Sequence, residues 1–350
     1  MINIEIIKDC GPFWKQIHSN DVFSIYHSKI WKDLIENTFN HTSLYLAASE
    51  YGKLIDVLPI FLIRSLFMGK KLISTPYEGC NGGFTSSDVK VRKMLIKQIL
   101  EHAQELNVQY VEIRSSFPIS ELKESGFIEK TPLLISEVIL KDLDENWQML
   151  SPKHRRNVRT AQKKGVTVEP ASNVAEMKIF YKILANHYRD LGVPFFGKNF
   201  FIQIWEKLIQ NNYASLLLAK LKEEVIGGHL LFFSGKTLVS KYAAVKKDRG
   251  FSKLYPSYAL FWEGIRLGIE KNFKNFSLGV TGESNTGLLD FKSRFGSKTN
   301  TVFFYYYPIR GKIPDFGKYY GEYSLLKRIW RITPSMFTYP VGQKINEWIC

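Results

Sequence analysis

The stretch Phe276–Pro308, FSLGVTGESNTGLLDFKSRFGSKTNTVFFYYYP, decides the fold of this chain. It begins within an apolar strand expected over Lys274–Leu278 and passes a polar turn whose Asn285 can cap the helix that follows. That helix carries Lys292, and the aromatic run Val302–Tyr307 predicts a buried strand. A strand end that meets a glycine-containing turn beside one lysine suits a polar ligand. A plain strand–helix–strand packing unit fits the same residues.

The composition describes a folded protein with room for about two domains. Of the 350 residues, 45% are hydrophobic and 14% aromatic. The cysteines Cys10, Cys80 and Cys350 form no C-x-x-C pair, which argues against a disulfide framework or a zinc site and favours a reducing compartment. The sequence has no signal peptide pattern and no apolar run of roughly 20 residues. We therefore expect a cytoplasmic protein that binds no metal.

A net charge of +15 predicts attraction to polyanions. The basic residues concentrate in the segment Asp144–Lys164, which we expect to be helical. Acidic residues are absent from 146–168, and Arg155, Arg159 and Lys163 recur four residues apart on one helix face. An anion-binding face is the first interpretation, and an ordinary solvated face is the second.

The same order of elements occurs twice along the chain. A hairpin over Leu44–Ser49 and Lys53–Arg64 has its counterpart at Ser215–Leu221 and Glu224–Ser234, about 170 residues later. Each hairpin precedes a strand, an amphipathic helix, another strand, a short helix and a final strand. The expected elements are Lys71–Thr75, Asp88–Leu106, Gln109–Arg114, Ser120–Ser125 and Leu133–Leu140 in the first half, and Thr237–Ala244, Pro256–Glu270 and the opening stretch in the second. This repetition predicts a tandem duplication of one α/β unit.

The chain lacks the usual motifs of several enzyme classes. It contains no G-x-x-x-x-G-K-[ST], no G-x-G-x-x-G after a strand, no G-x-S-x-G and no H-E-x-x-H. A duplicated α/β unit with basic surfaces suits a transferase that holds an anionic activated donor against an amine.

Several segments together resemble FemAB-like proteins of the GNAT superfamily, which are similar to the aminoacyltransferases that build peptidoglycan bridges. In the second half the resemblance lies in SPKHRRNVRTAQKKGV, FYKILANHYRDLGVPFF, GGHLLFF, FWEGIRLGI and NTGLLDFKSRFG. In the first half it lies in DVLPIFLIRSLFMGKKLISTP and YVEIRSS. The tail RIWRITPSMFTYPVGQKINEWI is similar to the ending of FemAB-like proteins found with exopolysaccharide and exosortase systems.

This resemblance implies an α/β (α+β) fold made of two GNAT-like units, each a mixed sheet with flanking helices, at 1–143 and 144–308, before a basic aromatic tail at 309–350. It implies an N-acyltransferase or aminoacyltransferase acting on an amine of a cell-envelope polysaccharide or peptidoglycan precursor. The donor would be acyl-CoA or aminoacyl-tRNA. The expected partners are an envelope glycan or lipid-linked precursor, and tRNA. The alternative is a non-catalytic GNAT-like binding protein of envelope polysaccharide assembly.

The resemblance also implies the site residues. Lys292, after Phe291, matches the family's FK pair near the acyl-transfer centre, where it could stabilise an oxyanion, and Glu283 and Tyr242 complete the expected catalytic group. The expected donor- and substrate-binding residues are Phe291, Asn285, Lys153, Arg155, Arg156, Arg159, Arg249, Lys253, Tyr255, Glu78, Asn81, Glu112 and Arg114. The loop KKDRGFSKLYPS departs from the family pattern, since Gly250 has no second glycine and Pro256 lacks an N–H group. This departure weighs against acyl-CoA.

The segment Tyr323–Ile332 mixes large apolar residues with Lys327, Arg328 and Arg331. Such a helix either docks on the second domain or lies at an anionic membrane surface. We expect a partly docked helix whose Trp330 side stays reachable, in a protein peripheral to the inner membrane.

Overall fold

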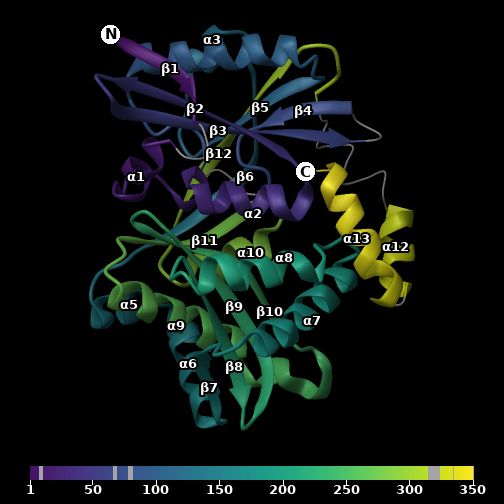
Figure 1. Ribbon diagram of the computed structural model, residues 1–350. Coiled ribbons are helices and arrows are strands. Elements are labelled where there is room, and N and C mark those ends of the chain that lie inside the picture. Colours follow the sequence, from purple (N-terminus) through teal and green to yellow (C-terminus); the bar gives the residue numbers. More distant parts are fainter. Residues whose placement is uncertain (8–10, 66–68, 78–81, 314–323, 334, 350) are drawn as a thin grey trace. The chain divides into compact units, whose positions relative to one another are not determined.

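The computed structural model describes residues 1–7, 11–65, 69–77, 82–313, 324–333 and 335–349 (Figure 1). The three cysteines and the expected site residues Glu78 and Asn81 lie outside this described part. The chain divides into two compact units. Unit 1 comprises 1–134, 300–320 and 345–350, and unit 2 comprises 135–299 and 321–344.

Unit 1 is a mixed sheet with helices packed on it. Its strands are hydrogen-bonded in the order β1 (Ile2–Ile6), β2 (Thr42–Glu50), β3 (Lys53–Ser65), β4 (Gly69–Ile73), β5 (Tyr110–Ser115) and β12 (Lys298–Pro308). Neighbouring strands are antiparallel, except that β4 and β5 are parallel. The helices are α1 (Phe13–His18), the 3-10 turn η1 (Ile25–His27), α2 (Lys29–Phe39), α3 (Val89–Glu105) and α4 (Ser120–Glu124).

The helix α3 covers one face of the unit 1 sheet (Figure 1). Its Val91, Leu95 and Ile99 recur near helical spacing and are fully buried in one apolar cluster with strand residues such as Leu46 and Leu58. Its first turn is capped by Asp88, which accepts hydrogen bonds from the backbone of the next turn. The predicted amphipathic helix is therefore confirmed.

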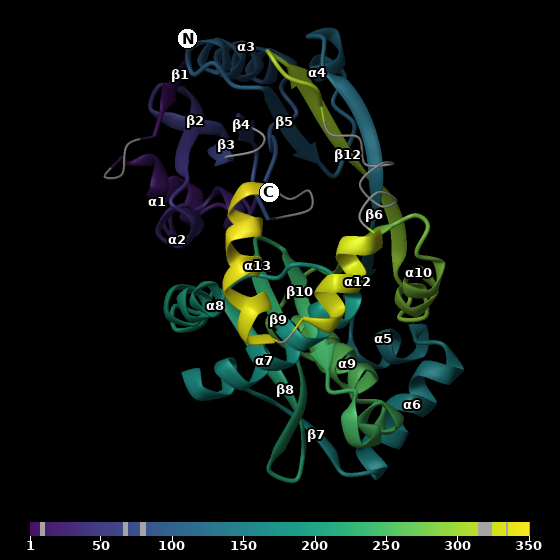
Figure 2. The same cartoon turned by 90° about the vertical axis from the view of Figure 1, so that its right-hand side faces the viewer.

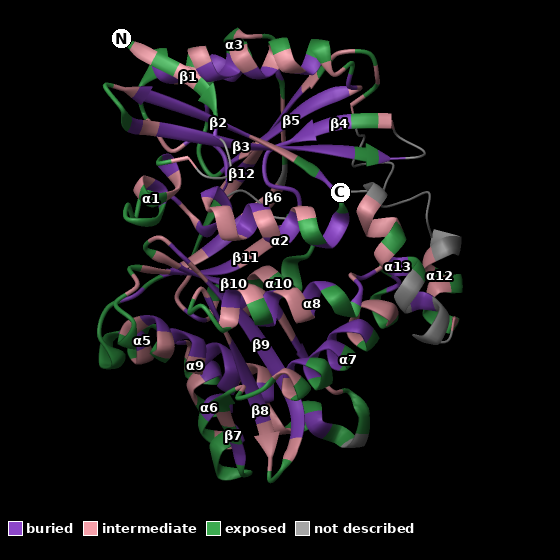
Figure 3. Cartoon of the chain, in the orientation of Figure 1, coloured by how far each residue is buried: buried purple, intermediate pink, exposed green. Residues whose placement is uncertain are grey.

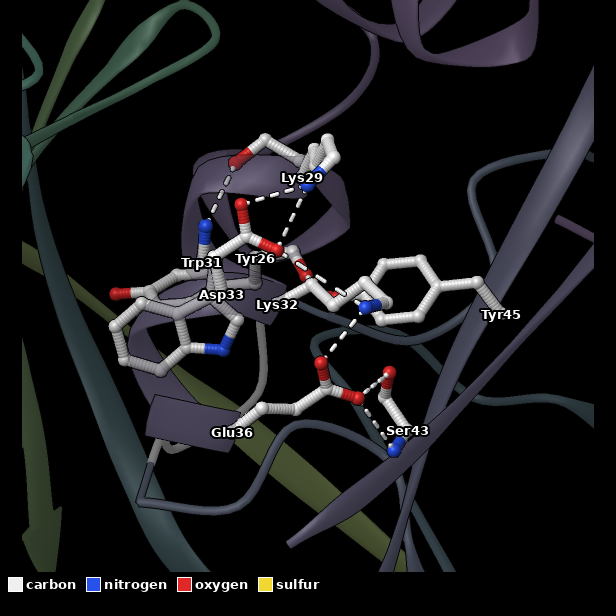
Figure 4. Close-up of polar contacts among 9 residues, drawn as sticks. Tyr26, Lys29, Trp31, Lys32, Asp33, Glu36, Ser43 and Tyr45 are labelled. Carbon is white, nitrogen blue, oxygen red and sulfur yellow. Dashed lines mark hydrogen bonds and ion pairs between the residues drawn. The ribbon is translucent and has the colours of Figure 1, made fainter. Parts of the chain in front are cut away.

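The helix α2 is fastened by charged side chains (Figure 4). Ser28 caps its first turn, and the Lys29 Nζ donates to both carboxylate oxygens of Asp33, at 2.9 and 2.7 Å. One turn further, Lys32 bonds Glu36 at 2.7 Å, and Glu36 accepts two bonds from Ser43 of β2. These pairs tie the helix to the second strand.

Unit 2 repeats the arrangement of unit 1. Its strands are hydrogen-bonded in the order β6 (Ile128–Ile139), β11 (Asn275–Gly282), β10 (Thr237–Val245), β9 (Glu224–Ser234), β8 (Ala214–Leu221) and β7 (Val166–Pro170), and β6 enters this unit at Ile135. The helical elements are α5 (Leu143–Met149), α6 (Pro152–Lys163), α7 (Val174–Leu191), α8 (Lys198–Ile204), η2 (Trp205–Ile209), η3 (Asp248–Leu254), α9 (Pro256–Glu270), α10 (Thr286–Ser293), α12 (Ser324–Ile332) and most of α13 (Ser335–Ile349).

The two faces of the unit 2 sheet carry different helices. α9 buries Leu260 and Ile265 in an apolar cluster with Val138 and Phe276, while α7 packs against the β9 and β10 strands. Figure 3 shows the strands as mostly buried and the outer faces of the helices as exposed. A side chain of this sheet therefore belongs either to the α9 face or to the α7 face.

The predicted tandem α/β fold is confirmed, and even an irregularity recurs. The β2–β3 pairing shifts between Ala48 and Ser49, and the β8–β9 pairing shifts between Ala219 and Lys220, at the equivalent place. One feature differs from the expected division at 143/144 and 308/309. Each unit takes its last strand from the other half of the sequence, because β12 pairs with β5 while β6 lies beside β11.

The expected single helical segment Asp144–Lys164 is two helices. Leu150 is extended (ψ 138°), Ser151 caps α6, and Pro152 occupies the first turn. Proline has no N–H to donate and disfavours helix at the preceding residue, so α5 ends before it and α6 begins with it.

Candidate active site

The parallel strands β10 and β11 separate partway along their length. They share three register pairs, ending at Val239 and Ser277, although the strands have nine and eight residues. A bulge at Lys241 shifts the pairing of β10 with β9 at the same level. The bulge also switches side-chain faces, so that Ser240 points to the α9 face and Tyr242 to the α7 face. Backbone groups beyond Val239 and Ser277 are thus free of strand pairing between β10 and β11.

At Gly279, two residues after the last register pair, the β11 backbone takes a left-handed conformation. Its φ of +77° is left-handed, a conformation that residues with a Cβ rarely adopt. A Cβ there would lie 3.2 Å from the carbonyl oxygen of Ser240. Its N–H donates a long 3.4 Å bond to the Ser277 hydroxyl. At the predicted glycine turn, the backbone of β11 therefore comes close to the backbone of β10 at Ser240.

Lys292 of α10 holds the end of β11. Its Nζ donates to the carbonyl oxygens of Gly279 at 2.7 Å and Val280 at 3.3 Å, and it lies 2.7 Å from the Thr281 hydroxyl. The side chain is only 4% exposed, and burial lowers the pKa of this amine to about 8. Lys292 lies beside the turn as expected, but its ammonium is covered and not solvent-reachable. It forms no ion pair with Asp290, which bonds Arg294 at 2.8 Å.

Phe291 belongs to an aromatic group at the start of α6. Its ring lies 5.3 Å from that of His154 and 5.4 Å from that of Tyr258, and its carbonyl is 3.1 Å from His154 Nε2. Burial lowers the pKa of His154 to about 4, so the ring is neutral and Nε2 is the donor. This group fixes α10, and hence Lys292, against α6.

The other two expected catalytic residues lie elsewhere. Tyr242 packs against Phe195, Phe196 and Phe201 on the α7 face. Glu283 is exposed in the turn before α10. Asn285 caps α10 by accepting a 3.3 Å bond from the Leu288 N–H, as the sequence predicted.

Sequence reasoning missed His229 of β9. This side chain is fully buried, its Nε2 lies 2.7 Å from the Ser240 hydroxyl, and burial lowers its pKa to about 4. The neutral histidine ties β9 to the residue just before the β10 bulge. The available signal was one polar residue within the apolar run GGHLLFF, which more often indicates a satisfied core histidine.

The basic residues of α6 divide into two kinds. Arg155 donates to the carbonyl oxygens of Gln148 at 2.9 Å and Leu150 at 3.0 Å, which terminates α5. Arg159 is exposed and stacks over Trp147 at 5.2 Å. Lys153, Arg156 and Lys163 are exposed, so they carry most of the free positive charge of this helix.

The loop before α9 is compact. The 3-10 turns of η3 fill the place of a glycine-rich anion loop, and Tyr255 enters α9 with a left-handed φ of 58°. Lys164 donates to the Lys253 carbonyl at 3.0 Å and lies over the Tyr255 ring. The side chain of Arg249 is outside the described part.

In unit 1, the position equivalent to the separation of β10 and β11 is occupied by side chains of unit 1 itself. Arg114 donates to Glu112 at 2.6 Å and covers the Phe304 ring at 5.0 Å. Ser74 accepts from the Arg114 N–H at 2.9 Å, and a Cβ on Gly83 would lie 2.4 Å from the Arg114 carbonyl oxygen. Glu112 and Arg114, expected as binding residues, thus form an internal pair in which Glu112 is buried and Arg114 half-buried.

Comparisons with known proteins agree with this architecture. Residues 152–293 match the family model of the acetyltransferase (GNAT) domain. The solved structure of FemX is similar with a TM-score of 0.73 and 16% identity, covering 93% of this chain and 100% of FemX. A tandem GNAT protein from the clavulanic acid biosynthesis pathway gives a TM-score of 0.55 and 9% identity, covering 90% of this chain and all of that one.

A further solved structure has a similar fold. The C-terminal domain of a putative lysylphosphatidylglycerol synthetase from Agrobacterium fabrum gives a TM-score of 0.56 and 15% identity, covering 79% of this chain and 87% of that one. The comparison with curated proteins finds no match. Unit 2 thus contains a segment that matches the acetyltransferase (GNAT) domain, and the chain shares the fold of FemX over nearly its whole length. The described residues hold no cluster of metal-ligating side chains.

Proposed function

We propose that this protein transfers an acyl or aminoacyl group from acyl-CoA or aminoacyl-tRNA to an amine of a cell-envelope polysaccharide or peptidoglycan precursor. The observation that carries the proposal is the separation of β10 and β11 beyond Val239 and Ser277, with Lys292 fixing the β11 side. Unpaired backbone N–H groups at such a place can hold a donor carbonyl and stabilise the oxyanion that forms during transfer.

Unit 2 is the proposed site of transfer, because the matching place in unit 1 is filled by the Glu112–Arg114 pair. Lys292 acts there as a positioning residue. Its Nζ lies within bonding distance of three oxygen atoms of the Gly279–Thr281 segment, so its charge fixes that segment from behind. A fixed strand end keeps the unpaired N–H groups aimed at one point.

Two observations favour aminoacyl-tRNA over acyl-CoA as the donor. The turn η3 offers no second glycine for a pyrophosphate, and Pro256 removes one N–H from the start of α9. On α6, the exposed Lys153, Arg156 and Lys163 form a row of cations that fits an RNA backbone. A similar fold occurs in FemX and in a putative lysylphosphatidylglycerol synthetase domain.

A donor and acceptor matrix tests this function. The full chain is incubated with radiolabelled acetyl-CoA, longer acyl-CoAs, or a pool of aminoacyl-tRNAs, each with amino sugars, a UDP-linked muropeptide or a lipid-linked glycan. Transfer of label to an amine in one combination supports the proposal and identifies the donor. Donor binding with no transfer in any combination would instead support a non-catalytic binding protein.

We also propose that the protein attaches to an anionic membrane surface through α12. This helix packs on α7 (Figure 2), and Arg331 bonds the Leu191 carbonyl at 3.4 Å. Ile329 and Ile332 stay 48% and 83% exposed beside the cations Arg328 and Arg331. Apolar and cationic side chains on one helix face suit the boundary between headgroups and acyl chains. None of the helices in the described part has the length and apolar content to cross a membrane.

A further inference from the structure

The strand β6 contributes a carboxylate, Glu137, beside the place where β10 and β11 separate. Its position follows from one bond, in which the Leu140 N–H donates to the Lys274 carbonyl at 2.9 Å. This bond joins the end of β6 to the start of β11, and the two strands are neighbours. They therefore run antiparallel, and three residues inward Glu137 lies abreast of Ser277.

Unit 1 shows the same register at the equivalent place. There the Ile309 N–H donates to the Gln109 carbonyl at 2.9 Å, and three residues inward Tyr306 pairs with Glu112. Glu112 in turn pairs with Ile73 of the parallel strand β4, as Ser277 pairs with Val239 of β10. Glu137 therefore occupies in unit 2 the position that Tyr306 occupies in unit 1.

The residues around this position differ between the units. Unit 1 fills it with Glu112 and Arg114, whose side chains bond each other. Unit 2 has Ser277 and Gly279 at the matching positions, which leave the carboxylate uncovered by such a pair. Glu137 is half-buried, and within the described residues no hydrogen bond or ion pair involves its carboxylate.

Alternation places Glu137 on the α7 face, since its neighbour Val138 belongs to the core beneath α9. Burial raises the pKa of Glu137 above its ordinary value. The elements packed against β6 and β11 carry the cations Lys241 on β10, Lys298 on β12 and Lys292 on α10. These cations do not reverse the rise in the pKa of Glu137, which burial causes.

From this juxtaposition we propose that Glu137 is the general base of the transfer reaction, which rests on the function proposed above. The acceptor nitrogen forms a bond to the acyl carbon while the bond from that carbon to the thiol sulfur or ribose oxygen of the donor breaks. The proton that the nitrogen loses goes to the Glu137 carboxylate and then to the leaving group. A carboxylate beside the point where β10 and β11 separate can accept a proton from an amine that attacks from the α7 face.

The test compares full-length wild type, Glu137→Gln, Glu137→Asp and the surface control Glu270→Gln in the transfer assay. We expect Glu137→Gln to lower kcat roughly 10²- to 10⁴-fold with an unchanged KM for the donor, and to remove the acidic limb of the pH–rate profile. Glu137→Asp should keep the acidic limb at a lower kcat, and Glu270→Gln should match wild type. Thermal unfolding of each variant separates a folding defect from a kinetic one.

Transfer that Glu137→Gln retains at the wild-type rate and with the acidic limb would overturn this inference alone. An absence of transfer by wild type with every donor would overturn the proposed function, and the inference with it. A variant that loses stability but keeps the acidic limb in its folded fraction would also refute the general-base role.

Discussion

Lys292 and Gly279 are joined by a 2.7 Å hydrogen bond between the Nζ of the helix residue and the carbonyl oxygen of the glycine at which β11 turns left-handed. The bond links the lysine that follows Phe291 on α10, which the sequence singled out, to the end of β11. It also explains why the lysine is buried, because its target is backbone and not solvent. The pair is therefore best tested through both stability and rate.

The first prediction concerns the titration of Lys292. Its pKa of about 8 in the folded chain lies below the ordinary 10.5, so between these values the unfolded chain binds more protons. Stability contributed by this group is lowest below pH 8 and rises as the pH increases to about 10.5. We expect wild type to gain up to about 3 kcal/mol relative to Lys292→Met over this range. Urea unfolding of both proteins at pH 7, 9 and 10.5 measures it.

The exposed Lys298, six residues further along, provides the control. Lys298→Met should track wild type at every pH. A stability difference between wild type and Lys292→Met that stays constant with pH would contradict the buried, shifted amine.

The second prediction concerns Gly279. A Cβ at its φ of +77° is strained and would press on the Ser240 carbonyl at 3.2 Å. Gly279→Ala should cost about 1–2 kcal/mol of unfolding free energy and slow transfer, since the bulge of β10 would have to move. Gly282→Ala is the matched control, because a Cβ there has no atom within 4 Å and no left-handed backbone. Equal effects of the two substitutions would refute the role of the close approach.

Sequence patterns predicted the elements but not the pairing of the last strands. α9 begins and ends at the predicted residues, because apolar spacing and Pro256 in the first turn are local signals. Which unit β6 and β12 each join depends on pairing between residues that are far apart in the sequence. Both strands are apolar and follow a short helix, so either could pair with β5 or β11.

The site was predicted less completely than the fold. Lys292 was placed correctly next to its turn, yet its burial depends on where the Gly279 and Val280 carbonyls point. The pairing of His229 with Ser240 joins two strands through a bulge that no spacing rule reveals. Glu137 gave no signal, because one glutamate in a strand is usually solvated.

The third prediction separates the two kinds of basic residue on α6. Arg156→Gln with Lys163→Gln should weaken tRNA binding and lower the slope of log K against log salt by roughly 1.5, because two phosphate contacts are lost. Arg155→Gln should instead destabilise the fold by about 1–3 kcal/mol, since the carbonyls of Gln148 and Leu150 lose their donor. Fluorescence anisotropy with labelled tRNA from 50 to 300 mM salt, roughly spanning physiological strength, gives the slope. Unchanged affinity across that range would assign Arg156 and Lys163 to a solvated face.

The fourth prediction concerns the Glu112–Arg114 pair of unit 1. Arg114→Met should cost about 3–5 kcal/mol, because the buried Glu112 carboxylate loses its cation. Glu112→Gln should cost less, because the Arg114 side chain is only half-buried. The double variant should lose less than the sum of the two. A double-mutant cycle from urea unfolding measures this coupling. Additive, small losses accompanied by weaker donor binding would favour the binding role that the sequence suggested.

The last prediction concerns α12 and the membrane. Each cation near an anionic surface contributes about 1 kcal/mol, and the apolar Ile329 and Ile332 add to it by leaving water. The full chain should therefore float with vesicles that contain phosphatidylglycerol and should float less with neutral vesicles or at high salt. Ile332→Gln and Arg328→Gln should each reduce recovery, whereas Ile179→Gln on the exposed side of α7 should not. Equal recovery of all these proteins in the unbound fraction would mean that α12 serves only to cover α7, and that its exposed isoleucines face water.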